Sequence, residues 1–141
     1  MNNHCLRIPE LSKNNPYWIE KHRYYELKHF CLQYRFWKIE RARIEERLVK
    51  DIGKPISINS GNIGNPTANV AEARIYYTNR IEMIERVAKE TDSIIGKYIL
   101  IGVTEGISYE IINSRMAVPC GKDMYYNLYR RFFWLLSNER Q

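Results

Sequence analysis

Polar side chains of the kinds that contact DNA gather near the C-terminus of the chain. They comprise Lys122, Tyr126, Asn127, Arg130 and Arg131 at helical spacing, with Arg115 a little earlier. In the major groove, asparagine forms a bidentate pair with adenine and lysine reaches guanine, so Lys122 and Asn127 are the candidates for base contacts. Arginine and tyrosine side chains bind phosphate oxygens, which makes the other four residues the candidates for phosphate contacts.

Two helices joined by a tight turn must position these side chains, and residues 105–137 have the pattern of such a helix-turn-helix. Ser108 can cap a short first helix, and Pro119 stops that helix because proline has no N–H to donate. Val118 is placed to fill the space between the two helices. The second helix is expected over residues 121–137, and at about 24 Å it is long enough to lie in a major groove.

Apolar side chains should attach both helices to a core. The stripe expected to be buried on the first helix comprises Ile107, Ile111, Ile112 and Met116. The stripe expected on the second helix comprises Met124, Leu128, Phe132, Leu135 and Leu136. The polar candidates would then face outward, with the first helix bracing the second against DNA.

Residues 106–136, GISYEIINSRMAVPCGKDMYYNLYRRFFWLL, resemble the sigma-region-4-like helix-turn-helix of small phage and prophage regulators. These are the late-gene activators of the ArpU/RinA type. The turn is slightly longer than in the tightest motifs of this kind, and Asn113 stands where a small alanine is usual. The resemblance implies regulation of transcription in the cytoplasm of a bacterial host. Its expected partners are double-stranded DNA and RNA polymerase or another protein.

Other classes of protein share this pattern. A phage small terminase subunit also combines a helix-turn-helix with long helices, but it assembles into rings. A phage inhibitor of a host defence nuclease would use the same helix pair against a protein. Two helices and a tight turn are also typical of a hairpin that only completes a core.

The rest of the chain predicts long helices and almost no strand, so the expected fold class is all-α. An aromatic, basic helical region over residues 1–52 is followed by a loop over residues 53–65. A helical scaffold over residues 66–141 then ends in the helix-turn-helix. The loop is rich in Gly, Pro and Asn, and Ile56-Ser57-Ile58 within it is a short strand pattern.

Several local signals predict where the helices begin and end. Asn before Pro predicts helix starts at Asn15-Pro16 and Asn65-Pro66. The residues ETDS, 90–93, predict an interruption, and Gly106 predicts a helix end because glycine accepts the left-handed conformation. The apolar face of the helix after residue 66 is expected to comprise Val70, Ala73, Tyr77, Ile81, Ile84, Val87 and Ala88.

The N-terminal helical region carries two apolar stripes, which predicts either burial on two sides or a break between Gln33 and Phe36. The first stripe comprises Leu27, Phe30, Tyr34, Trp37, Ile44 and Leu48. The second comprises Trp18, Tyr25, Leu32, Phe36 and Ile39. Aromatic and basic side chains alternate here, a pattern that fits a surface for single-stranded nucleic acid. At helical spacing it fits a core or a homodimer interface better.

Composition narrows the class of protein. The 141 residues suit one domain, and 45% of them are hydrophobic, which excludes a mainly disordered chain. The net charge of +6 favours a polyanionic partner, but most of the surplus lies in the first 50 residues. The chain has no apolar run long enough for a membrane span and no secretory leader is expected, so no membrane association is predicted.

Residues that could carry catalysis or hold a metal are few. His22, Glu26 and His29 share one helix face with the spacing of a zinc site, but three basic residues beside them would repel a cation. Cys120 precedes a helix, where the dipole can favour a thiolate, although a buried thiol at that position is the simpler interpretation. No enzymatic activity, metal or cofactor is therefore expected.

Overall fold

The computed structural model describes residues 14–51 and 66–141, and within these ranges every regular element is a helix. The helices are α1 (Lys21–Leu32), α2 (Tyr34–Asp51), α3 (Pro66–Thr91), α4 (Gly96–Glu105), α5 (Tyr109–Met116) and α6 (Lys122–Glu139). The expected all-α class is confirmed. In the part of the chain that is described, no helix is both long and apolar enough to cross a membrane.

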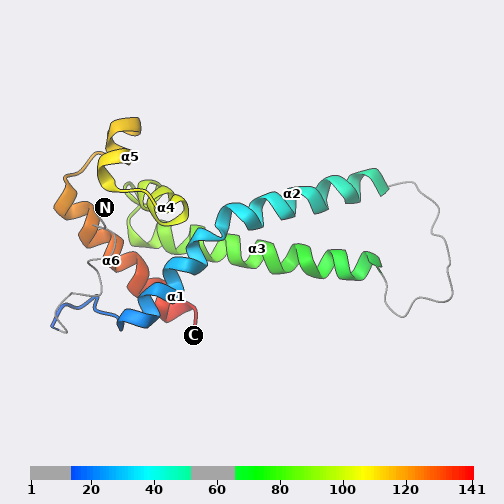
Figure 1. Cartoon of the computed structure of the whole chain (residues 1–141), viewed down its shortest axis with the longest axis horizontal. Coiled ribbons are helices and arrows are strands. Elements are labelled where there is room, and N and C mark those ends of the chain that lie inside the picture. Colours follow the sequence, from blue (N-terminus) through cyan, green and yellow to red (C-terminus); the bar gives the residue numbers. More distant parts are fainter. Residues whose placement is uncertain (1–13, 52–65) are drawn as a thin grey trace.

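The helices form a packed body from which one pair extends. Figure 1 shows α2 and the first part of α3 lying side by side as a long arm. In the body, α4 and α6 pack on the second half of α3, α1 packs on α4 and α6, and α5 packs on α4. Tyr34 and Trp37 on α2 are buried, as are Ile81, Ile84 and Val87 on α3. The apolar face predicted for α3 is therefore buried in the body, whereas Val70, Ala73 and Tyr77 on the arm are half-buried.

The start of α1 differs from the expectation. Asn15-Pro16 does not open a helix: the Asn15 side chain accepts a hydrogen bond from the N–H of Tyr17 at 2.9 Å and caps a turn instead. The helix begins at Lys21, where Glu20 accepts hydrogen bonds from the N–H groups of His22 and Arg23. The bond from His22 is the main reason that the pKa of Glu20 is lowered. A stronger local cap thus takes the role that the Asn-Pro signal predicted five residues earlier.

The predicted break in the N-terminal region is confirmed, because α1 ends at Leu32 and α2 begins at Tyr34. Of the two apolar stripes, the first enters the core, with Leu27 and Phe30 almost completely buried. On the second stripe, Leu32, Phe36 and Ile39 are exposed. The loop predicted over residues 53–65, its short strand pattern and the cap at Asn65 lie outside the described residues, but α3 does begin at Pro66.

Two connections in the second half of the chain follow their local signals. The interruption predicted at residues 90–93 separates α3 from α4, and the Asp92 carboxylate accepts hydrogen bonds there from the N–H groups of Ile94 and Ile95. Gly106 ends α4 with φ of 67°, as expected for the left-handed residue after a helix. Buried residues from both sides of the undescribed segment belong to one hydrophobic cluster, so α1 and α6 share a core.

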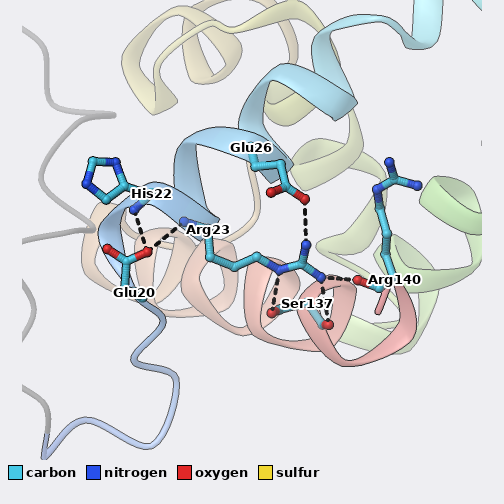
Figure 2. A network of polar contacts seen from close by, with 6 residues as sticks. All are labelled: Glu20, His22, Arg23, Glu26, Ser137 and Arg140. Atoms are coloured by element: carbon cyan, nitrogen blue, oxygen red, sulfur yellow. Dashed lines mark hydrogen bonds and ion pairs between the residues drawn. The ribbon is translucent and has the colours of Figure 1, made fainter.

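Arg23 of α1 holds the C-terminal end of α6. Its guanidinium donates to the Ser137 hydroxyl at 3.2 Å, to the Ser137 carbonyl at 3.1 Å and to the carbonyl of Arg140 (Figure 2). The remaining amino group pairs with Glu26 at 2.6 Å. The last carbonyls of a helix have no partner within the helix. Arg23 therefore satisfies groups that α6 alone would leave open, and it fixes α1 against α6.

Replacing Arg23 with lysine is expected to destabilise the protein by about 1–3 kcal/mol, because the three N–H groups of an ammonium, all on one atom, cannot reach the four acceptors that the planar guanidinium binds. Urea unfolding followed by circular dichroism measures this loss. Arg43→Lys is the matched control, because Arg43 is exposed and its ion pair is with Glu40, one turn earlier on the same helix. Equal losses in the two variants would contradict the role assigned to Arg23.

Candidate nucleic-acid interface

Local hydrogen bonds form α5 and the turn after it. Ser108 is the N-cap of α5, as predicted, and its hydroxyl accepts from the N–H of Ile111. After the helix, Ala117 has φ of 54°, and the side-chain oxygen of Asn113 accepts a hydrogen bond from the N–H of Val118 at 2.9 Å. The asparagine that departs from the usual motif therefore holds the turn, and Val118 is buried as expected.

Three tyrosines join α5 to α6. The hydroxyl of Tyr109 donates to the carbonyl of Cys120 at 2.7 Å, and the N–H of Tyr109 donates to the hydroxyl of Tyr126 at 3.2 Å. The rings of Tyr109 and Tyr125 lie 5.3 Å apart. Tyr126 was a candidate for phosphate contact, but the structure places it half-buried in this joint. The first turn of α6 is thus fixed against α5.

The buried faces of both helices differ in part from the prediction. On α6 the completely or nearly buried residues are Tyr125, Tyr129, Phe132, Phe133 and Leu136, so only two members of the predicted stripe are among them. Met124 is 54% exposed, and on α5 only Ile112 is buried while Ile111 and Met116 are exposed. Two apolar stripes overlap on α6, and the aromatic one enters the core because its rings pack edge to face with one another and with Tyr24.

The candidate contact residues fall into two groups. Asn127, Lys122 and Arg115 are exposed at the end of the molecule formed by α5 and the start of α6. Arg130 and Arg131 are half-buried nearer the body. Arg115 forms no ion pair with any other described residue, and its guanidinium is therefore available to an anion.

Lys122 is exposed but paired. Its ammonium lies 2.5 Å from the Glu110 carboxylate of α5. A hydrogen bond from Lys122 is the main reason that the pKa of Glu110 is lowered, so the pair is ionised at neutral pH. Sequence reasoning missed Glu110 as part of the site. Its position in the first turn of α5 was visible, but its contact with Lys122 depends on the geometry of the turn.

Arg130 and Arg131 are less available than predicted. Arg131 donates to the hydroxyl of Tyr17 at 3.4 Å, and the ring of Tyr17 packs on Trp134 at 5.8 Å. The segment before α1 therefore covers the second half of α6. The Nε of Arg130 is buried with no hydrogen-bond partner among the described residues. Nothing in the local sequence pattern pointed to this cover by Tyr17.

The side chains that the sequence offered for a metal site or for a reactive thiol are not arranged for either role in the described residues. Within residues 14–51 and 66–141, no three His, Cys, Asp or Glu side chains are placed to hold a metal ion, and Glu26 pairs with Arg23. Burial raises the pKa of the Cys120 thiol and the charge of Asp92 adds to this, so the thiolate is disfavoured there. This contradicts an activated Cys120 and agrees with a half-buried thiol.

Comparison with known proteins finds no matching family model, no matching curated protein and no matching solved structure. The resemblance of residues 106–136 to phage regulators therefore stays a prediction. The arrangement of α5 and α6 is the structural basis for proposing a function.

Proposed function

We propose that this protein is a sequence-specific regulator of transcription of the phage or prophage type, which binds double-stranded DNA with α6 in the major groove. In this proposal α5, the turn over residues 117–121 and α6 form the helix-turn-helix, and the protein acts in the cytoplasm of a bacterial host. RNA polymerase and a second copy of the chain are its proposed protein partners.

The observation that carries the proposal is the division of α6 into a fixed half and a free half. The second half is held by Arg23, by the aromatic core and by an ion pair between Glu139 and Arg86 of α3. The first half presents Asn127 and Lys122 to solvent, while on its other side it packs on α5 and, through the buried Tyr125, on α4. A rigid helix with an exposed, polar first half is what contact with base edges requires.

The charges around the free half support an anionic partner. The N-terminus of a helix carries partial positive charge and unpaired N–H groups, and the N-cap of α6, Gly121, has no side chain that would satisfy them. Arg115 and Lys122 lie on either side of the turn that leads to this helix end. Phosphate groups beside the major groove would meet the positive potential of the helix end and of Arg115, whereas the charge of Lys122 is partly neutralised by Glu110.

Asn127→Ala is expected to relax sequence preference at one base position, by about 1–3 kcal/mol between the preferred and other bases. Selection of bound duplexes from a random pool, followed by titration of the selected duplex, measures the change. Asn138→Ala is the matched control, because Asn138 is exposed on the same face of α6 three turns later. Binding that is absent, or that does not depend on salt concentration, would contradict the proposal.

Glu110→Gln is expected to strengthen binding to all duplexes by about threefold to tenfold, because it removes a negative charge beside DNA and releases Lys122 from its ion pair. The gain should disappear in the Lys122→Ala background, which a titration of the four proteins with one duplex tests. Glu72→Gln is the control, because Glu72 is exposed on the arm, away from α5 and α6. An equal gain in both backgrounds would show that Lys122 takes no part.

A second candidate function is binding to a protein, as in an inhibitor of a host defence nuclease. The observation that favours it is the exposure of Met124 at 54% beside Asn127, with Ile111 at 42% on α5. Exposed apolar side chains among polar ones are typical of protein interfaces. Capture of a host protein by this surface, unchanged by nuclease treatment and lost in Met124→Glu, would favour this candidate. A ring-shaped assembly in solution would instead favour a small terminase subunit.

A further inference from the structure

A groove between α2 and α4 lies apart from the proposed DNA surface and shares no residue with it. Its volume is about 620 Å³, and its lining includes Arg35, Lys38 and Ile39 of α2 with Leu100, Ile101 and Glu105 of α4. Figure 1 shows that α2 runs from the body out along the arm, while α5 and the start of α6 lie at the opposite end of the molecule. We propose that this groove binds an acidic, amphipathic helix of a partner protein, an inference that goes beyond DNA binding.

The apolar side chains of the groove have the spacing of a helix-binding face. Ile39 is 45% exposed, Ala42 lies one turn later, and Leu100 and Ile101 are half-buried on the opposite wall. Leu32 extends the apolar surface toward the end of α4, since its Cδ2 would lie 3.1 Å from a Cβ atom placed at Gly106. Residues 35, 39 and 42 recur at intervals of four and three, which places them along one side of α2. A helix laid between two helices meets such a row along its own apolar side.

The charged side chains along the groove favour an acidic partner over a basic one. Arg35 and Lys38 are exposed, and neither forms an ion pair with another described residue; the Lys38 ammonium lies 5.3 Å from the centre of the Tyr34 ring. Glu105, at the C-terminal end of α4, is the one acidic residue among the described residues that line the groove. A helix with acidic residues beside its apolar stripe would pair with Arg35 and Lys38, whereas a basic helix would be repelled.

The same observations argue against single-stranded nucleic acid in this groove. Nucleobases bind by stacking on exposed aromatic rings. Tyr34 is the aromatic residue of the described lining, and it is buried, with its hydroxyl donating to Glu85 of α3 at 3.2 Å. Burial, followed by the charge of Glu85, raises the pKa of Tyr34 to about 12. The remaining floor is aliphatic, which suits leucine-like side chains better than bases.

A designed peptide tests the proposal. The probe is a fluorescein-labelled helical peptide with leucines at helical spacing and glutamates elsewhere, compared with the same peptide carrying lysines in place of the glutamates. We expect the acidic peptide to bind the full chain and the basic one not to bind, as measured by fluorescence anisotropy. Arg35→Glu with Lys38→Glu should weaken the acidic peptide about tenfold or more, and Ile39→Ser should weaken it about threefold.

The control is a second double variant, at two basic residues of the same helix. Arg47 and Lys50 repeat the spacing of Arg35 and Lys38, are exposed, and lie on the arm away from α4. Arg47→Glu with Lys50→Glu should change binding less than about twofold. No binding of the acidic peptide, equal losses in the two double variants, or tighter binding of an oligothymidine that depends on Arg35 and Lys38 would each overturn the proposal. Duplex binding that depends on Asn127 is measured separately, so a failure of either proposal is recognised on its own.

Discussion

Gly96→Ala is expected to lower the free energy of unfolding by about 3 kcal/mol or more, the largest effect expected from alanine at any glycine that the structure describes. Gly96 is the first residue of α4 and lies against the backbone of α3. A Cβ atom there would lie within 3.0 Å of both the carbonyl carbon and the carbonyl oxygen of Ala88. Because both atoms belong to the backbone of a buried helix, the clash can be relieved only by moving α4 away from α3.

Thermal unfolding followed by circular dichroism measures this effect, and a decrease in Tm of about 10 °C is expected. Gly121→Ala is the control, because a Cβ atom at Gly121 would meet nothing within 4 Å. That variant should lose about 1 kcal/mol or less, the usual cost of alanine at an N-cap. If Gly96→Ala were as stable as Gly121→Ala, α4 could not approach α3 as closely as described.

The second large effect is expected at Gly102, where α4 faces α6. A Cβ atom at Gly102 would lie 3.3 Å from Cδ1 of Ile112 and far inside contact distance of the Tyr125 hydroxyl. Tyr125 is completely buried, so its ring cannot swing away. Gly102→Ala should therefore destabilise the protein by about 2–3 kcal/mol and loosen α6 against α4.

Tyr125→Phe provides the test, because it removes the oxygen atom that the new methyl group would meet. In a double-mutant cycle measured by urea unfolding, Gly102→Ala should cost at least about 1 kcal/mol less in the Tyr125→Phe background. The nearest remaining ring atom, Cζ, would lie at 3.5 Å, an ordinary contact. Simple additivity of the two substitutions would show that the methyl group and the hydroxyl do not meet.

Local signals in the sequence predicted much of the fold. The break near Gln33, the cap at Ser108 and the left-handed Gly106 are confirmed, because each depends on residues within one helical turn. Asn15-Pro16 failed as a helix start, because the carboxylate of Glu20 provides a cap nearer to the apolar face of α1. The close approach at Gly96 could not be predicted, since it depends on how two helices pack.

The candidate site was predicted less completely than the fold. Asn127 and Arg115 are exposed where the pattern put them, but Tyr126 is part of the joint between α5 and α6. The apolar stripe predicted for α6 from its spacing included Met124, which the structure exposes. Which stripe is buried depends on the aromatic partners that α1 supplies, and a single helix pattern contains no information about them.

The contact between α1 and α6 also has a kinetic consequence. Arg23 and the carbonyl of Arg140 are separated by 117 positions in the chain, so the body closes through one of the longest sequence separations available to it. Contacts between residues far apart in the sequence form slowly, because the chain must lose the entropy of the intervening loop before the contact can stabilise it. During synthesis, Tyr24 of α1 cannot make its ring contact with Phe133 until α6 has been made. A chaperone that binds exposed apolar side chains would then increase the yield of the native protein.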